Sequence, residues 1–139
     1  MKHIVRNILF LLLGLTIGIA GTVKQYEKPA EQVLSDTLPR ISAEQLFSRY
    51  HQDELKANRK YWNEPIQVEG IIKEVYQASD GNLKVLLQGG NRFYGVICKI
   101  QASEEQIEKP LKIGGQVIVQ GRCFGMDNNV RLTDCLVSY

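Results

Sequence analysis

The sequence predicts a single small, mainly β domain, a five-stranded barrel that follows an N-terminal apolar segment. Three observations lead to this prediction. The chain has 139 residues, which is enough for one domain with its own core and too few for two of ordinary size. An uncharged stretch stands at its beginning, and from Ile66 onward the apolar residues alternate with the period of a β-strand. We therefore divide the chain into an apolar segment (1–23), a linker (24–41) and a domain (42–139).

The apolar segment predicts membrane targeting. Residues 8–23 carry no charge and follow Lys2 and Arg6, and their length is close to the lower limit for a bilayer span, about 17 residues. An uncleaved transmembrane anchor is the first interpretation, and a cleaved signal peptide with small residues near its end is the alternative. Both place the domain outside the cytoplasm: on the periplasmic side of a bacterial inner membrane if uncleaved, or secreted if cleaved.

A helix is expected to open the domain. Residues 24–41 contain two prolines and mixed charge, which is typical of a linker. Ser42 can then act as N-cap with Gln45 as its capping-box partner. One apolar stripe follows, formed by Leu46, Phe47 and Tyr50. Asp53 is expected to interrupt the helix and restart it as far as Tyr61.

Five strands are expected beyond this helix, over residues 66–76, 83–88, 92–100, 116–124 and 130–138, with a short helix at 103–109 between the third and the fourth. Gly70 lies inside the first strand and predicts a bend that lets this strand serve two sides of a small barrel. Three strands, a helix and two strands are the element order of an OB-fold, a Greek-key barrel. The fold class expected is therefore a five-stranded OB-fold barrel with an N-terminal helix packed on it.

Two segments resemble a known family. The run ISAEQLFSRYHQDELKANRKYWNEPIQVEGIIKEV (41–75) and the later run IGGQVIVQGRC (113–123) are similar to the tRNA_anti-like family of small bacterial OB-fold proteins. The resemblance extends from about Ile41 to the C-terminus. It implies the fold and does not imply an activity.

Charge and residue types argue against several functions. Lys2 and Arg6 account for the whole net charge of +2, so the rest of the chain is neutral, whereas nucleic-acid binders usually carry a concentrated positive face. The histidines are His3 and His51 alone, and no nucleophile, histidine and acid stand at a catalytic spacing. There is no C-x-x-C pair for a metal. We therefore expect that the protein is not an enzyme, that it has no catalytic residues, and that it binds no metal or cofactor.

The candidate ligand-binding surface is the one that OB-folds use, the face of strands two and three with the adjoining loops. Its candidate residues are Lys84, Arg92, Phe93, Tyr94 and Lys99, with Asp127, Asn128 and Asn129 at the rim. Phe93 and Tyr94 are adjacent, so only one of them would face outward from a regular strand.

The three cysteines, Cys98, Cys123 and Cys135, all fall on expected strands. In an exported protein an odd number suggests one disulfide and one free thiol. A Cys123–Cys135 bridge is the first choice; a Cys98–Cys135 bridge and three buried thiols are the alternatives.

The sequence thus predicts a membrane-anchored, extracytoplasmic OB-fold binding module for a protein or envelope-glycan partner. One alternative is a protein that binds single-stranded nucleic acid. Another is a structural or stress-related envelope protein with no small ligand.

Overall fold

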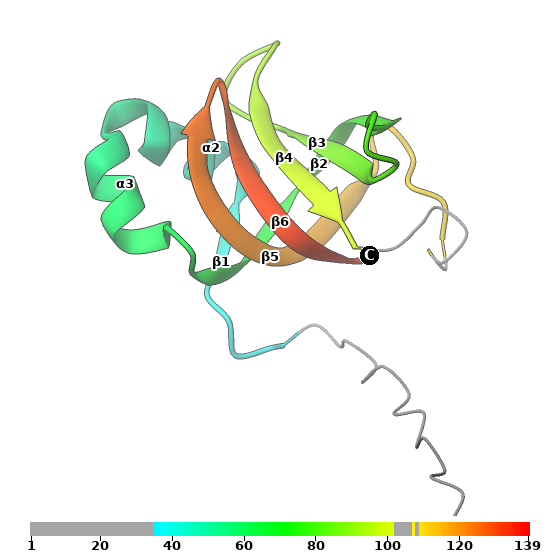
Figure 1. Ribbon diagram of the computed structural model, residues 1–139, viewed down its shortest axis with the longest axis horizontal. Helices are drawn as coiled ribbons and strands as arrows, with labels where there is room; N and C mark the ends of the chain where they lie inside the picture. Colours follow the sequence, from blue (N-terminus) through cyan, green and yellow to red (C-terminus); the bar gives the residue numbers. More distant parts are fainter. Residues whose placement is uncertain (1–34, 102–106, 108) are drawn as a thin grey trace, which may run out of the picture. The chain divides into compact units, whose positions relative to one another are not determined.

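The computed structural model describes residues 35–101, 107 and 109–139. Its elements in chain order are β1 (Arg40–Ser42), α2 (Ala43–Gln52), α3 (Glu54–Tyr61), β2 (Pro65–Gln77), β3 (Leu83–Gln88), β4 (Gly95–Ile100), β5 (Gln116–Asp127) and β6 (Asn129–Ser138) (Figure 1). The predicted segment 1–23, residues 24–34 of the linker and most of the predicted helix 103–109 lie outside the described residues. Among the described residues no helix is both long enough and apolar enough to span a bilayer.

The two helices begin where the sequence predicts. The Ser42 hydroxyl accepts a hydrogen bond from the Gln45 N–H at 3.1 Å and caps α2. Asp53 ends α2 and caps α3, because its carboxylate accepts from the Lys56 N–H at 2.9 Å. The apolar stripe of α2 is buried against the strands, with Leu46 fully inaccessible to solvent. The predicted break and restart at Asp53 are confirmed.

The strands close into a barrel with OB-fold topology. β2 pairs antiparallel with β3 and β3 with β4, while β5 pairs antiparallel with both β6 and β2. A parallel pairing of β4 with β6 completes the ring. The predicted mainly β, closed five-stranded barrel with helices on it is confirmed.

β2 serves two sides of the barrel. Its residues Pro65–Ile71 pair with β5, and Ile72–Gln77 pair with β3. Gly70 lies at this change of partner, where a Cβ atom would come within 3.0 Å of the Ala43 Cβ. The absence of a side chain therefore lets α2 approach the strand as it bends.

Three features differ from the prediction by more than one residue. A short strand, β1, forms within the predicted linker and runs parallel to β2, where the Arg40 Nε donates to the side chain of Gln67. β4 begins at Gly95, three residues later than expected, because residues 91–94 form a turn. β5 continues to Asp127, because Gly125 adopts a positive φ of 77° and lets the strand pass a bulge.

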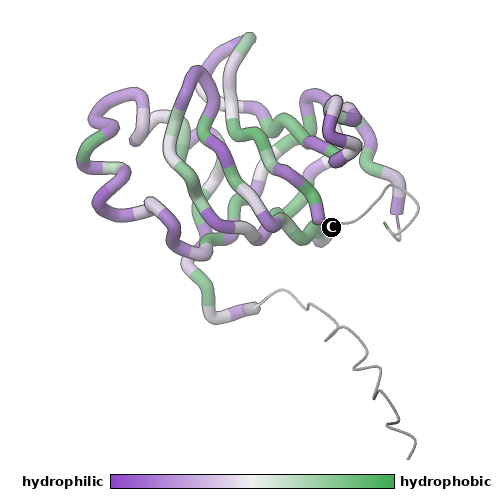
Figure 2. Tube along the Cα trace, viewed as in Figure 1, coloured by the Kyte–Doolittle hydropathy of each residue, from purple (hydrophilic) through white to green (hydrophobic). Residues whose placement is uncertain are grey.

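Alternating side chains fill the barrel interior, whereas hydrophilic residues predominate along α3 and the loops (Figure 2). All three cysteines are buried free thiols. The Cys123 Sγ lies 3.2 Å from the Tyr50 hydroxyl, and the Cys135 thiol is hydrogen-bonded to Cys98. The structure therefore differs from the predicted Cys123–Cys135 bridge. The register explains the difference: Cys123 pairs with Leu132, which lies three residues before Cys135 on β6.

Candidate binding face on the barrel

The outer surface of β2, β3 and β4 presents a row of polar and aromatic side chains near one end of the strands. The pairing register aligns Tyr76 with Lys84 and Lys84 with Lys99. Their neighbours Val85 and Cys98 point into the core. Alternation along the strands therefore places the three side chains together on the outside. A tyrosine and two lysines thus lie side by side across three strands.

A second row crosses the middle of the same surface. Glu74, Leu86, Ile97 and Arg131 follow one another in register across β2, β3, β4 and β6. Leu86 is 5% exposed yet does not belong to the interior cluster, so its neighbours on the outer surface cover it. The centre of the surface is therefore apolar, with one acidic and one basic residue at its two edges. We call these two rows together the binding face.

The β2–β3 turn bounds one end of the binding face. Its Asp80 carboxylate lies 3.5 Å from the Lys99 Nζ, with both side chains nearly half exposed. Hydrogen bonds from Asn82 lower the pKa of Asp80, and the positive charges of Lys99 and Lys84 add to this effect. The carboxylate therefore stays ionised and offsets part of the lysine charge.

The β3–β4 loop bounds the other end. Its Asn91 side chain accepts hydrogen bonds from the N–H groups of Phe93 and Tyr94, at 2.9 and 2.8 Å. This turn exposes both rings, Phe93 to 73% and Tyr94 to 40%. The expectation that only one of them faces outward is wrong, because they belong to a turn and not to a strand.

The predicted site residues fall into three groups. Lys84 and Lys99 are neighbours on the binding face, whereas Arg92, Phe93 and Tyr94 form the β3–β4 loop, to which Lys73 donates a hydrogen bond at the Arg92 carbonyl. Asp127 and Asn128 are exposed where β5 turns into β6. The Asn129 side chain accepts from the Gly95 N–H at 2.8 Å and so ties this turn to the loop. Asn129 has a structural role here.

Sequence reasoning missed Tyr76 and Arg131. Both could have been found by pairing the expected strands: the turn at 78–82 places Tyr76 opposite Lys84, and parallel pairing of the third and fifth strands brings Arg131 beside Ile97. The signal lies in cross-strand register and not in any local motif.

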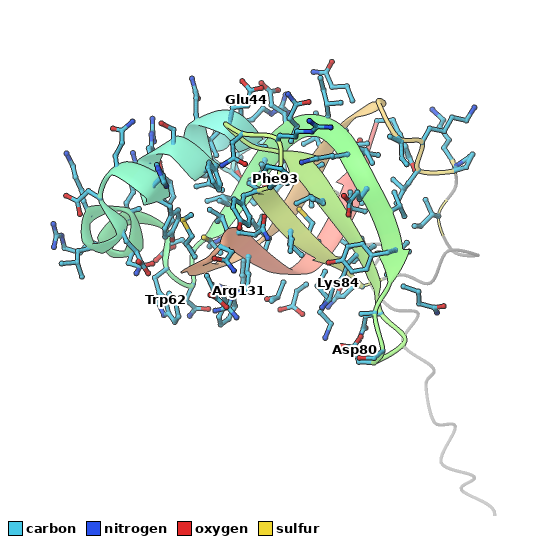
Figure 3. The ribbon with its side chains drawn as sticks, turned by 90° about the horizontal axis from the view of Figure 1, so that it is seen from above. Glu44, Trp62, Asp80, Lys84, Phe93 and Arg131 are labelled. Carbon is cyan, nitrogen blue, oxygen red and sulfur yellow. The ribbon has the colours of Figure 1, made fainter. Side chains whose placement is uncertain are left out.

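One more exposed aromatic residue lies at the end of α3. Trp62 is 52% exposed and makes an edge contact with the Phe124 ring at 5.7 Å between centroids. Its ring also covers Gly125, where an added Cβ would lie 2.8 Å from the indole. Figure 3 shows Trp62, Arg131, Lys84 and Asp80 along one side of the barrel.

This arrangement can hold an extended ligand by ring stacking together with positive charge. Tyr76, Phe93, Tyr94 and Trp62 are exposed rings, and Lys84, Lys99, Arg92 and Arg131 are the cations on or beside the face. Within the described part of the chain, no three His, Cys, Asp or Glu side chains are grouped to hold a metal ion.

Comparisons with known proteins point to one family. The model of the tRNA_anti-like family matches residues 1–136. A candidate nucleic acid-binding lipoprotein from Klebsiella pneumoniae superposes with a TM-score of 0.59 at 13% identity, over 77% of this chain and all of that one. At this identity the likeness concerns the fold alone.

Two weaker structural matches follow. The Stn1–Ten1 complex of S. pombe gives a TM-score of 0.40 at 14% identity, over 76% of this chain and 78% of that chain. An aspartyl-tRNA synthetase candidate from Leishmania major gives 0.45 at 6% identity, over 78% of this chain and 22% of that chain. No curated protein matches the sequence.

Proposed function

The chain belongs to the tRNA_anti-like family, and we propose that it is a binding module that takes single-stranded nucleic acid across the binding face. The observation that carries the proposal is the set of exposed rings and cations on and beside the binding face: Tyr76 with Lys84 and Lys99 in one row, Arg131 at the edge, and Phe93 and Tyr94 at the far end. Bases can stack on the rings, and phosphates can approach the cations between them. Affinity would be modest, because Asp80 and Glu74 offset part of the positive charge.

The sequence alone favours a protein or glycan partner over nucleic acid, and the exposure of Phe93 and Tyr94 reverses this order. A single outward ring would be a poor stacking platform, whereas two rings in one turn, with Tyr76 at the far end of the face, offer stacking positions at both ends. The candidate nucleic acid-binding lipoprotein from Klebsiella pneumoniae has the same fold, which is compatible with the proposal.

A protein or envelope-glycan partner is the second candidate. Its support is the apolar centre of the face, where Leu86 and Ile97 lie between the two charged edges. Protein interfaces have apolar centres with polar rims, and exposed aromatic rings also stack on sugars. In this case the cations would contribute little to affinity, so the two candidates differ in their dependence on salt.

We also propose that the protein is not an enzyme and that an uncleaved segment 1–23 anchors it with the domain outside the cytoplasm. The absence of charge from residues 8–23, after Lys2 and Arg6, supports the anchor. Fractionation of cells, followed by protease treatment of spheroplasts, tests the placement. A domain that sediments with membranes but resists protease until the membrane is broken would contradict it.

The binding experiment uses the full chain in non-ionic detergent and fluorescein-labelled single-stranded oligonucleotides, measured by anisotropy at low salt. Tyr76→Ala should weaken binding by about 1–3 kcal/mol, because it removes a stacking contact. The double change Lys84→Gln with Lys99→Gln should also weaken binding, because it removes two positive charges. Arg59→Gln is the matched control, because it removes one exposed cation from α3 and leaves the binding face intact.

The result expected is equal affinity for the unchanged chain and the Arg59→Gln control, and weaker binding by the face variants. No binding at low salt, or equal losses in all variants, would refute the nucleic-acid proposal. Retention of the unchanged chain on purified peptidoglycan or a membrane-protein fraction, insensitive to added salt, would then favour the second candidate.

A further inference from the structure

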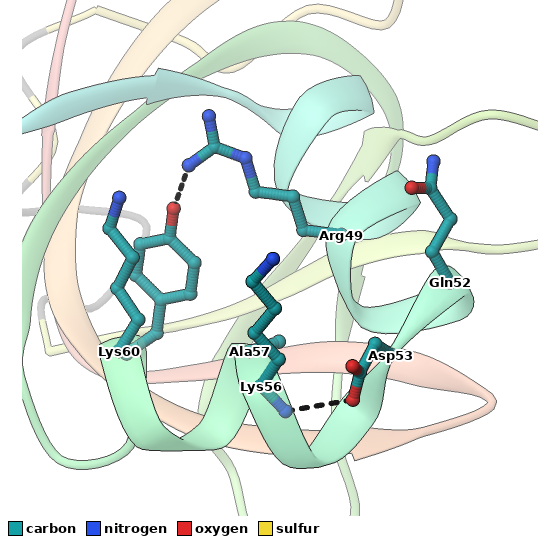
Figure 4. Close-up of a pocket in the computed structure, with 7 residues that line it drawn as sticks. Arg49, Gln52, Asp53, Lys56, Ala57 and Lys60 are labelled. Atoms are coloured by element: carbon teal, nitrogen blue, oxygen red, sulfur yellow. Dashed lines mark hydrogen bonds between the residues drawn. The ribbon is translucent and has the colours of Figure 1, made fainter.

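A pocket between α2 and α3 gathers positive charge that is separate from the binding face. It has a volume of about 480 Å³, within the range of small-molecule sites. The cationic side chains that line it are Arg49 from α2 and Lys56 and Lys60 from α3. Figure 4 shows these three side chains directed into the space between the two helices. We call this the interhelix pocket.

The Tyr61 side chain brings two of these cations together. The Arg49 Cζ lies 5.9 Å and the Lys60 Nζ 5.4 Å from the centre of its ring. Arg49 also donates a hydrogen bond to the Tyr61 hydroxyl, which fixes the direction of the guanidinium. The tyrosine is 5% exposed, so both cations are held by a side chain that packing keeps in place.

Within the described part of the chain, no acidic side chain forms an ion pair within 4 Å of these cations. Lys56 and Lys60 are four residues apart on α3, a like-charge spacing that destabilises a helix. Asp53 lines the pocket and caps the helix by accepting the Lys56 backbone N–H; its single carboxylate offsets part of the charge, and the three cations leave the lining net positive. Throughout residues 35–101, 107 and 109–139, the one ion pair within 4 Å joins Lys99 to Asp80. An anion in the interhelix pocket would relieve the repulsion.

A neighbouring cavity extends the same basic surface. It has a volume of about 510 Å³, shares Arg49, Lys60 and Tyr61 with the interhelix pocket, and adds Arg40 from β1. Glu64 is the acidic residue in its lining. The positive surface therefore continues from the helix pair to the strand where the chain enters the domain.

We propose that the interhelix pocket binds a phosphate group, with Arg49 providing a planar pair of N–H donors and Lys56 and Lys60 providing charge. Guanidinium groups match tetrahedral oxyanions in geometry, and lysines attract them as point charges. The phosphate could belong to a soluble phosphate compound or to the headgroup of an anionic lipid, since both present the same chemistry. This site is separate from the binding face, and its existence does not depend on the proposed function.

The test uses the full chain in non-ionic detergent, with pyrophosphate as the soluble probe and phosphatidylglycerol added to the micelles as the lipid probe. Affinity for pyrophosphate is measured by calorimetry, and each probe is also tested for its effect on Tm. Lys56→Gln combined with Lys60→Gln removes the α3 charges. Arg59→Gln, from the same helix but outside the pocket lining, is the matched control.

We expect pyrophosphate to bind the unchanged chain and the Arg59→Gln variant equally, and the double variant at least about tenfold more weakly. The single change Lys56→Gln should fall between them, which keeps the test valid if the double variant folds poorly. Lys60→Arg should retain binding because it keeps the charge. Lys84→Gln on the binding face should leave pyrophosphate affinity unchanged, which separates this site from the nucleic-acid proposal.

The lipid arm identifies the source of the phosphate. If phosphatidylglycerol raises Tm and competes with pyrophosphate, while phosphatidylcholine does neither, the ligand is an anionic headgroup. If only pyrophosphate acts, the ligand is a soluble phosphate compound. Absence of any effect from both probes at low salt, or equal affinity in the double variant and the unchanged chain, would overturn the proposal.

Discussion

Gly95 joins the β3–β4 loop to the barrel, and changing it to alanine should destabilise the domain strongly. A Cβ at this position would overlap the backbone carbonyl oxygen of Leu87 and lie 2.8 Å from the Gly89 nitrogen. Both are backbone atoms, one in the paired strand β3 and one just after its end, so the contact cannot be relieved by a rotamer change. The start of β4 must move away from β3.

The size of the effect follows from two losses. Forcing an extra carbon into a packed region costs about 1–3 kcal/mol. Moving the Gly95 N–H away from the Asn129 side chain forfeits a part-buried hydrogen bond, about 0.5–1.5 kcal/mol. The free energy of unfolding should therefore fall by about 2–4 kcal/mol. For a domain of this size the fall in Tm is about 10–20 °C.

Gly90→Ala is the matched control, because a Cβ there would meet only the Phe47 ring, at an ordinary 3.7 Å. This change should be neutral or should raise stability by up to about 1 kcal/mol, since alanine restricts the unfolded chain. Urea unfolding of both variants, followed by circular dichroism, measures the difference. A gap of less than about 0.5 kcal/mol between them would refute the reasoning from backbone overlap.

Three further predictions concern binding, packing and pH. If four cations contact phosphates, log K for an oligonucleotide should fall with log salt at a slope of about −2.8, and Lys84→Gln should reduce this slope by about 0.7 in anisotropy titrations; an unchanged slope would exclude a phosphate contact by Lys84. Leu46→Ala should lower the free energy of unfolding by about 3–5 kcal/mol in urea titrations, because the side chain is wholly buried between α2 and the strands; a loss below about 1 kcal/mol would mean that the helix is loosely packed. Burial raises the pKa of Cys123, and the hydrogen bond with Cys98, together with burial, raises that of Cys135. The contribution of these protonated thiols to stability is therefore fully present below the unfolded thiol pKa of 9.0 and should decrease as pH rises above it. Thermal unfolding between about pH 7 and 10 measures this decrease, and a Tm that does not change over this range would contradict the shifts.

Much of the fold could be predicted because its determinants are local. The Ser42 and Asp53 caps mark helix starts through hydrogen bonds to residues three positions away. The alternation after Ile66 sets the strands, and Gly70 marks the point at which β2 changes partners. Each of these features is visible in a window of a few residues.

The errors arose where distant residues decide the structure. β1 has three residues and depends on pairing with β2 around Gln67, so nothing within the linker predicts it. The late start of β4 depends on the Asn91 amide, which binds two N–H groups and makes a turn from residues with strand-like composition. The thiol neighbours depend on register across the barrel, which places Cys135 by Cys98.

The binding face was predicted in part for the same reason. Lys84 and Lys99 could be selected from their strands, but their alignment with Tyr76 needs two cross-strand registers. The exposure of both Phe93 and Tyr94 needs the turn geometry. The interhelix pocket had no sequence signal, since basic residues near a helix C-terminus are ordinary.

The closed ring of strands restricts the ways in which a partner can engage this domain. Recognition by strand addition needs a free row of backbone N–H and C=O groups, as at an open sheet edge. β3 is paired on both sides and the parallel β4–β6 pairing closes the ring, so the edges that the described strands leave open are short: the outer edge of β1, three residues long, and the end of β2 at Glu74–Gln77, which pairs with β3 alone. A partner can therefore add a strand only at these short stretches, and elsewhere it contacts side chains. The same shortness of the open edges disfavours edge-to-edge pairing between copies of the domain at high concentration.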